Sequence, residues 1–445
     1  MSLHAINGKG PNDQKILNEE LVGGIVDVAR RNPQHAAELF GLPLGVAMRL
    51  VALGESQLDD LATTPVALWR PRLDAALVHR LSVRRPMGSP ELEAYRPVLE
   101  RLNRLALATF VRYADDPAEA ALVCELTDPA TITALQDLPA FAVMEWGGNP
   151  GEPLVSPMLG EAAIERLLRP EGEPVEPALR GLLAFAQRSE PQYEDMAKAL
   201  AQESAAYAMA AARSAEERAA PKRSGRPVSS FLMPATSSLI LMMLRHQMRP
   251  TEVEEHMLAT NDVRAVQLRA IAEELNPRPK REKGAPRDRS RDHRDLWGSA
   301  HRRLTATAVW LLHRRLLAAG VEPFEAVIRA YDYYATTYEP ACGVSLSRML
   351  KDVFEPMRAG VDTHLGYCTR CGVVHVSHEE KAGIIECPVC VLARAGKYGN
   401  RRARTVRVEA PVPRVPASAS SWGGGGAALW FQPLKVNEPG GGGGQ

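Results

Sequence analysis

Four cysteines crowd into the 23 positions from Cys368 to Cys390 of this 445-residue chain, and their spacing constrains the fold more than any other feature. Cys368 and Cys371 form one C-x-x-C pair, and Cys387 and Cys390 form a second pair after 15 intervening residues. Each such pair directs two thiolates at one point, so two pairs supply a closed tetrahedral zinc site. The chain has only two other cysteines, which is too few for a disulfide framework. The sequence therefore predicts a zinc ion bound by four cysteines.

Two histidines near these pairs are the competing ligands. His375 and His378 follow the first pair, but the matched spacing favours four cysteines. A redox role is less favoured, since two matched pairs exceed what a thioredoxin-type site needs. The apolar runs at residues 373–376 and 383–385 are expected to form the two strands of a zinc ribbon. Because four sulfurs leave no open coordination position, the metal is predicted to be structural.

Composition and charge describe a multidomain globular chain with unlike halves. The hydrophobic content is 45%, enough for two or three domain cores. The chain has no apolar run long enough to span a membrane and no apparent signal peptide, so we expect a cytoplasmic protein without membrane contact. The net charge of +1 conceals an asymmetry: residues 1–200 carry 19 basic and 28 acidic side chains, and the remainder carry 35 and 25. This asymmetry favours a binding role for the second half.

Helical spacing dominates residues 17–61, with breaks at Asn32 and Gly41. Residues 36–50 have the spacing of a helix-turn-helix across a tight glycine turn. The residues expected to face inward are Ala36, Phe40, Leu42, Ala47 and Leu50. Two interpretations of this segment remain open. It contacts DNA, with Arg49 near the groove, or it is a plain helical hairpin.

A weak internal repeat relates two front segments at a shift of 84 or 85 residues. Leu17 and Asn18 correspond to Leu102 and Asn103, and several following apolar positions match as well. Each copy leads into a short expected strand, at residues 66–69 and 153–155. In the second copy Glu125 replaces the turn glycine Gly41, which makes a helix-turn-helix less favourable there. The alternative is chance similarity between helical segments.

The expected fold class is mainly α, with tandem small helical domains followed by a helical domain that carries a four-cysteine zinc ribbon. Two long helices are expected at residues 304–319 and 323–338. The predicted domains are a first repeat at 1–80, a second repeat at 95–160, a helical linker and hinge at 161–227, a helical domain at 228–395 with its ribbon at 368–390, and a basic, then Gly/Pro-rich disordered tail at 396–445.

Two basic stretches of the second half are candidates for phosphate contact. Residues 278–303, the basic loop, hold ten Lys/Arg and four Asp/Glu, and residues 391–408, the post-cysteine basic segment, hold no acidic residue. The alternative for both is an ordinary solvated surface. The candidate DNA-binding residues are Arg264, Gln267, Lys280, Arg281, Lys283, Arg394, Lys397, Arg401, Arg402 and Arg404.

The common catalytic motifs are missing from the sequence, including G-x-S-x-G, H-E-x-x-H and the P-loop, so we predict that the chain is not an enzyme. Three classes of function are compatible with the sequence. A DNA-binding regulator is favoured, a zinc-ribbon protein-protein interaction scaffold is the main alternative, and an accessory domain of an enzyme is the least favoured.

Residues 320–331 and Tyr334, followed by the four-cysteine pattern, resemble FlhC, one subunit of the flagellar master transcriptional activator. The resemblance covers residues 239–390, and the four cysteines match the zinc ligands of that family. The front copies, most clearly at residues 36–42, are similar to the partner subunit FlhD, more weakly in the second copy.

The resemblance implies a sequence-specific transcriptional activator that binds double-stranded promoter DNA and contacts RNA polymerase. In that family four FlhD chains assemble with two FlhC chains. A homodimer of the present chain through its FlhD-like units would reproduce this ratio. The regulated genes are expected to be flagellar genes or the transfer genes of a mobile element.

Overall fold

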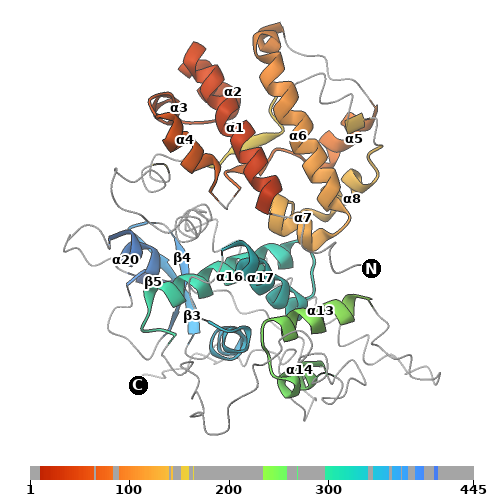
Figure 1. Ribbon diagram of the computed structural model, residues 1–445, viewed down its shortest axis with the longest axis vertical. Helices are drawn as coiled ribbons and strands as arrows, with labels where there is room; N and C mark the ends of the chain where they lie inside the picture. The colour runs from red at the N-terminus through yellow and green to blue at the C-terminus, as the bar shows by residue number, and fades with distance from the viewer. Residues whose placement is uncertain are drawn as a thin grey trace, which may run out of the picture. The chain divides into compact units, whose positions relative to one another are not determined.

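The computed structural model is mainly helical, as the sequence predicts, with a few short strands (Figure 1). The residues that it describes are 11–64, 67–83, 90–139, 142–143, 152–159, 164, 234–257, 268, 296–338, 344–359, 363–371, 373–378, 386–394 and 405–408. Most of the predicted linker, most of the basic loop and the Gly/Pro-rich tail lie outside these ranges. None of the described helices combines the length and the apolar character needed to cross a bilayer.

The chain divides into two compact units. Unit 1 comprises residues 1–189, 314–321 and 333–341, and unit 2 comprises residues 190–313, 322–332 and 342–445. Both predicted repeats fall within unit 1, and all four clustered cysteines fall within unit 2.

Two successive sets of helices, each with one short strand, build unit 1 (Figure 1). The first set is α1 (Pro11–Arg31), α2 (Pro33–Phe40), α3 (Leu44–Val51), α4 (Glu55–Ala62), β1 (Trp69–Pro71) and α5 (Ala75–Val83). The second set is the 3-10 helix η2 (Pro90–Tyr95), α6 (Arg96–Ala114), α7 (Pro117–Cys124), α8 (Pro129–Gln136) and β2 (Val155–Pro157). The strands β1 and β2 pair antiparallel, with Arg70 opposite Ser156.

Local capping explains why both sets break at equivalent points. Asn32 caps α2 by accepting from the backbone N–H of His35, and Asp116 caps α7 by accepting from those of Ala118 and Glu119. A proline follows each cap at the first helical position, where its missing N–H costs nothing. The two sets therefore start their second helices with the same device.

An asparagine from the first long helix holds the strand in each set. Asn18 Oδ1 accepts from Leu68 N at 2.7 Å, and Asn103 Oδ1 accepts from Leu154 N at 2.8 Å. The same side chains donate to the carbonyls of Thr64 and Glu152. Because these bonds fix the residue before each strand, β1 and β2 begin three and two residues later than the sequence analysis expected.

After the turn at Gly41 and Glu125, the shift that relates the two copies changes from 84 to 85 residues. The buried residues of α3 are Val46, Ala47 and Leu50, and those of α8 are Thr131, Ile132 and Leu135. This correspondence requires a shift of 85, so Ile132 matches Ala47, whereas a shift of 84 would match it with Met48. The second copy has one extra residue before α8, which explains the change.

The core of unit 1 is assembled from both sets. Trp69 of β1 and Phe110 of α6 are fully buried, and their ring centroids lie 5.8 Å apart. The ends of the later helices α16 and α17 also belong to this unit. Arg315 Nη2 lies 2.8 Å from Glu125 Oε1, and the Tyr333 hydroxyl donates to Gln14 Oε1 at 3.1 Å.

Unit 2 combines helices with a small antiparallel sheet (Figure 1). Its helices are α13 (Pro234–Arg245), α14 (Pro250–Met257), most of α16 (Ala300–Ala318), most of α17 (Pro323–Thr337), α18 (Leu346–Arg348), the π-helical turn η5 (Met349–Phe354), α19 (Glu355–Ala359) and α20 (Pro388–Arg394). Its strands β3 (Thr363–Cys368), β4 (Val374–His378) and β5 (Thr405–Val408) form a sheet in the order β4-β3-β5.

Candidate metal centre and basic segment

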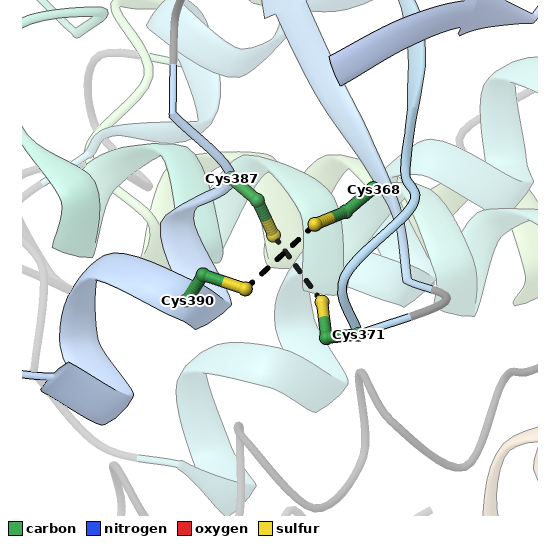
Figure 2. A group of neighbouring side chains, drawn as sticks. All are labelled: Cys368, Cys371, Cys387 and Cys390. Atoms are coloured by element: carbon green, nitrogen blue, oxygen red, sulfur yellow. Dashed lines mark hydrogen bonds between the residues drawn. The ribbon is translucent and has the colours of Figure 1, made fainter. Parts of the chain in front are cut away.

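The four cysteine sulfurs of unit 2 converge on one point (Figure 2). All four lie within 4.8 Å of one another, with Cys368 Sγ 3.7 Å from Cys390 Sγ and Cys371 Sγ 3.6 Å from Cys387 Sγ. These separations are far longer than a disulfide bond. Four sulfurs at a Zn–S distance of about 2.3 Å from a tetrahedral ion would lie about 3.8 Å apart. The geometry therefore suits a metal ion held by four sulfurs.

Two different local structures present the two pairs. Cys368 is the last residue of β3 and Cys371 lies in the turn before β4, where the Cys368 N–H donates to Val373 O at 3.0 Å. Cys387 directly precedes α20, and Cys390 lies in its first turn. We call β3, β4, α20 and their four cysteines the four-cysteine module.

The strands of this module differ in part from the expected ribbon. The run at residues 373–376 forms most of β4, as expected, but the partner of β4 is β3, a strand that the sequence analysis did not predict. The expected strand at 383–385 lies outside the described residues. β3 was missed because its sequence lacks a strong alternating pattern and its pairing is set by residues several positions further along the chain.

The competing histidines are not part of the convergent set. His375 is fully buried on β4, with its Nδ1 at 3.4 Å from Val376 O, and the ring of His378 lies 5.0 Å from that of Trp297. Of the two remaining cysteines, Cys124 is buried in unit 1, as expected for an apolar role, and burial raises the pKa of its thiol. Cys342 lies outside the described residues.

Mutual hydrogen bonding governs the protonation of the four thiols. Hydrogen bonds within the cluster lower the pKa of Cys368 and Cys390 and raise the pKa of Cys371 and Cys387. A soft divalent ion is the type of cation that four convergent sulfurs select, and its binding would require the loss of the remaining thiol protons.

The helix α16 contacts both halves of the module through one face. Arg303 Nη1 donates to Glu386 O at 2.7 Å, directly before Cys387, and Thr307 Oγ1 accepts from Val376 N of β4 at 3.2 Å. Arg303 is the last residue of the basic loop, for which the sequence leaves open phosphate contact or an ordinary solvated surface. In the structure Arg303 lies in α16 and its exposed fraction is only 7%. Its position one turn before Thr307, on the helix's buried face, was the available signal.

The post-cysteine basic segment leaves the module and returns to it. It starts within α20, whose last residue is Arg394, and it ends with β5, which pairs with β3 so that Thr405 lies opposite Cys368. The ten residues between them, 395–404, contain four basic side chains and no acidic one. The remaining predicted DNA-binding residues, all outside the described ranges, are Arg264, Gln267, Lys280, Arg281, Lys283, Lys397, Arg401, Arg402 and Arg404.

The helix-turn-helix-like segment α2–α3 has the interior that the sequence predicts. The five residues expected to face inward, Ala36, Phe40, Leu42, Ala47 and Leu50, are all buried. Its outer face is partly apolar, because Leu44 and Met48 of α3 are 42% and 57% exposed. Such side chains suit contact with protein better than contact with phosphate.

No protein-family model, curated protein or solved structure matches the chain.

Proposed function

We propose that the chain is a sequence-specific DNA-binding transcriptional activator of the FlhD/FlhC type, built around a structural zinc ion. The observation that carries this proposal is the attachment of the post-cysteine basic segment to the four-cysteine module at both ends, through α20 and β5. Lysine and arginine side chains in such a segment would lie where they can follow a phosphate backbone.

Anchoring the cationic groups to a folded module increases their affinity for phosphate. A segment tethered at both ends loses less conformational entropy on binding than a free tail does. Six basic side chains without an intervening acid also give a local positive potential that steers association with a polyanion. These contacts supply affinity and register, whereas specificity requires other side chains at base edges.

Zinc suits the four cysteines and would act as a structural element. With four protein sulfurs the tetrahedral shell is complete, so the ion would supply folding free energy rather than a reactive position. The residues that would hold it are Cys368, Cys371, Cys387 and Cys390.

Other parts of the proposal rest on the resemblance to FlhC and FlhD. They are a cytoplasmic location, contact with RNA polymerase, control of flagellar or mobile-element transfer genes, and a homodimer through the FlhD-like units. In unit 1 the two copies already pair with each other through β1 and β2. A homodimer would therefore join two such pairs, giving four FlhD-like copies.

The test is selection of genome fragments by the purified chain at about 0.15 M salt, where nonspecific binding is partly suppressed. Enrichment of a few promoter fragments supports the proposal, and uniform recovery of fragments contradicts specificity. The double variant Arg401→Ala, Arg402→Ala should weaken binding to all fragments and reduce the salt slope by about two units.

The matched control removes two arginines from unit 1, with Arg101→Ala and Arg104→Ala on the outer surface of α6. It produces the same charge change and should leave the salt slope intact. No recovery of any fragment would favour the alternative, an interaction scaffold, which the exposed Leu44 and Met48 support.

A further inference from the structure

We propose that the outer face of α3 is the contact through which two copies of this chain form a homodimer. This inference rests on the homodimer of the proposed function and assigns a surface to it. The surface consists of Leu44, Gly45, Met48 and Ala52, which are all exposed, and we call it the α3 face. Leu44 and Met48 lie one helical turn apart, so their side chains leave the helix on the same side.

Exposed large apolar side chains are rare in the part of the chain that the structure describes. They occur there at three positions, Ile16, Leu44 and Met48. Ile16 belongs to α1, whereas Leu44 and Met48 share one turn of α3. A single exposed apolar residue is ordinary, but neighbouring ones often mark a site of contact with another protein.

The second copy in unit 1 provides an internal comparison. At the shift of 85 residues, the positions of the α3 face correspond to Pro129, Ala130, Thr133 and Asp137 in and directly after α8. These positions are exposed in both copies, so the fold does not require apolar side chains there. Thr133 and Asp137 are polar, whereas their counterparts Met48 and Ala52 are apolar. The apolar character of the α3 face therefore indicates a contact that α8 does not make.

The uncharged character of the α3 face favours a second copy of the chain as its partner. In a two-fold contact a side chain near the axis faces its own counterpart, so an ionised group there would meet a like charge. The four residues of the α3 face have no ionisable side chain, whereas the corresponding surface of α8 includes Asp137. Gly45 has no side chain, which allows the backbones of two helices to approach closely.

The α3 face would be the centre of a larger contact. A stable dimer buries roughly 1,200–2,000 Å² of surface in total, which is more than four positions on each chain supply. The centre of an interface is its most apolar part, and a few large side chains there contribute most of the affinity. Leu44 and Met48 are therefore the residues whose replacement should weaken the dimer most.

The experiment is sedimentation velocity of the full-length chain over a series of concentrations. The double variant Leu44→Glu, Met48→Glu places like charges on both sides of the two-fold axis, and we expect it to raise the Kd of the dimer at least about 100-fold. The matched control, Pro129→Glu with Thr133→Glu, gives the same charge change at the equivalent positions of α8. Its Kd should stay within about threefold of that of the parent chain.

Urea unfolding checks that the variants are folded, as the exposure of Leu44 and Met48 leads us to expect. Should the glutamate variant fail to fold, the variant Leu44→Ala, Met48→Ala replaces it, with an expected rise in Kd of about 10-fold.

Two results would overturn the inference, and they differ in what they leave standing. If the parent chain and the glutamate variant form equally stable dimers, the dimer uses another surface, and the homodimer of the proposed function stands without the α3 face. If the parent chain is monomeric at every concentration, the α3 face and the homodimer are both rejected. Enrichment of promoter fragments by that monomer would still support sequence-specific DNA binding.

Discussion

Gly41 and Glu125 occupy the same left-handed position in the two copies of unit 1, with φ angles of 69° and 57°. Each residue ends the second α-helix of its copy, and its backbone N–H bonds to a carbonyl of that helix, that of Ala37 for Gly41 and that of Ala120 for Glu125. Glycine adopts this conformation without strain, whereas glutamate pays roughly 1 kcal/mol for it. Glu125 gains an ion pair in exchange, with Arg315 Nη2 at 2.8 Å.

The substitutions Glu125→Gly and Glu125→Ala separate these two effects. Both remove the ion pair, but only glycine also removes the left-handed strain. We expect Glu125→Ala to be less stable than Glu125→Gly by about 1 kcal/mol, measured by urea unfolding. Equal stability of the two variants would contradict the assigned backbone conformation.

Gly41→Ala should destabilise unit 1 by more than 1 kcal/mol, on the order of the left-handed penalty plus a steric contribution. A Cβ at this position would lie 2.8 Å from Arg72 Nη2, and Arg72 Nη1 donates to Leu39 O. The same unfolding measurement applies, with Gly54→Ala as control, because no atom lies within 4 Å of a Cβ there and its φ is −72°. If the two variants unfold alike, the turn does not require glycine.

Asn18 and Asn103 should both stabilise the strand pair, Asn18 more strongly. Replacing Asn18 by alanine leaves a buried N–H and a buried carbonyl without partners, which costs about 1–3 kcal/mol, whereas the bonds of Asn103 are only partly buried. Hydrogen exchange of the amides in β1 and β2 provides the measurement, and both strands should lose protection in either variant. Gln34→Ala removes only an exposed bond to Glu38 and serves as the control. Unchanged protection in Asn18→Ala would refute this coupling.

Local signals explain how much of the fold could be predicted from sequence. Asn32 and Asp116, each followed by proline, predict the start of a helix, and α2 and α7 begin at those prolines. The strand positions could not be read in this way, because Asn18 fixes Leu68 from 50 residues away. The exact start of a strand is thus a tertiary property here.

In the candidate site, too, local features could be predicted from the sequence and long-range contacts could not. The four-cysteine set follows from spacing alone, since two short turns carry all the ligands. Arg303 could not be connected with them, because its partner Glu386 lies 83 residues further along the chain. The strand β3 could not be predicted either, since it forms by pairing with both β4 and β5.

Asp128 makes the stability of α8 dependent on pH. Hydrogen bonds from the Thr131 hydroxyl and from the N–H groups of Thr131 and Ala130 lower the pKa of this capping carboxyl below 3.8. The contribution of Asp128 to folding stability is therefore complete above the ordinary carboxyl pKa of 3.8. This contribution is lost as the pH falls through the lower pKa of the folded state. We expect Asp128→Ala to cost about 1 kcal/mol at pH 7, with a difference that shrinks in acid.

The check is urea unfolding of both chains between pH 7 and pH 3. Asp128→Asn keeps an acceptor oxygen without a titrating group, so this capping contribution should not titrate in that variant. A difference between Asp128→Ala and the parent chain that stays constant over this range would exclude the charged cap as its source.

Metal removal should unfold the four-cysteine module while leaving unit 1 folded. The module is short, and sulfur contacts join its two cysteine pairs, so a bound metal would supply folding energy on the order of 10 kcal/mol. After chelation, amides of β3, β4 and α20 should exchange rapidly, and those of α1 and α6 should stay protected. Zn²⁺ should restore protection and Mg²⁺ should not, since thiolates disfavour hard cations. Cys387→Ser should show the same rapid exchange without any chelator. Slow exchange of the β4 amides in that variant would contradict this prediction. It would mean that the contact of β4 with Thr307 of α16 holds the strand without metal.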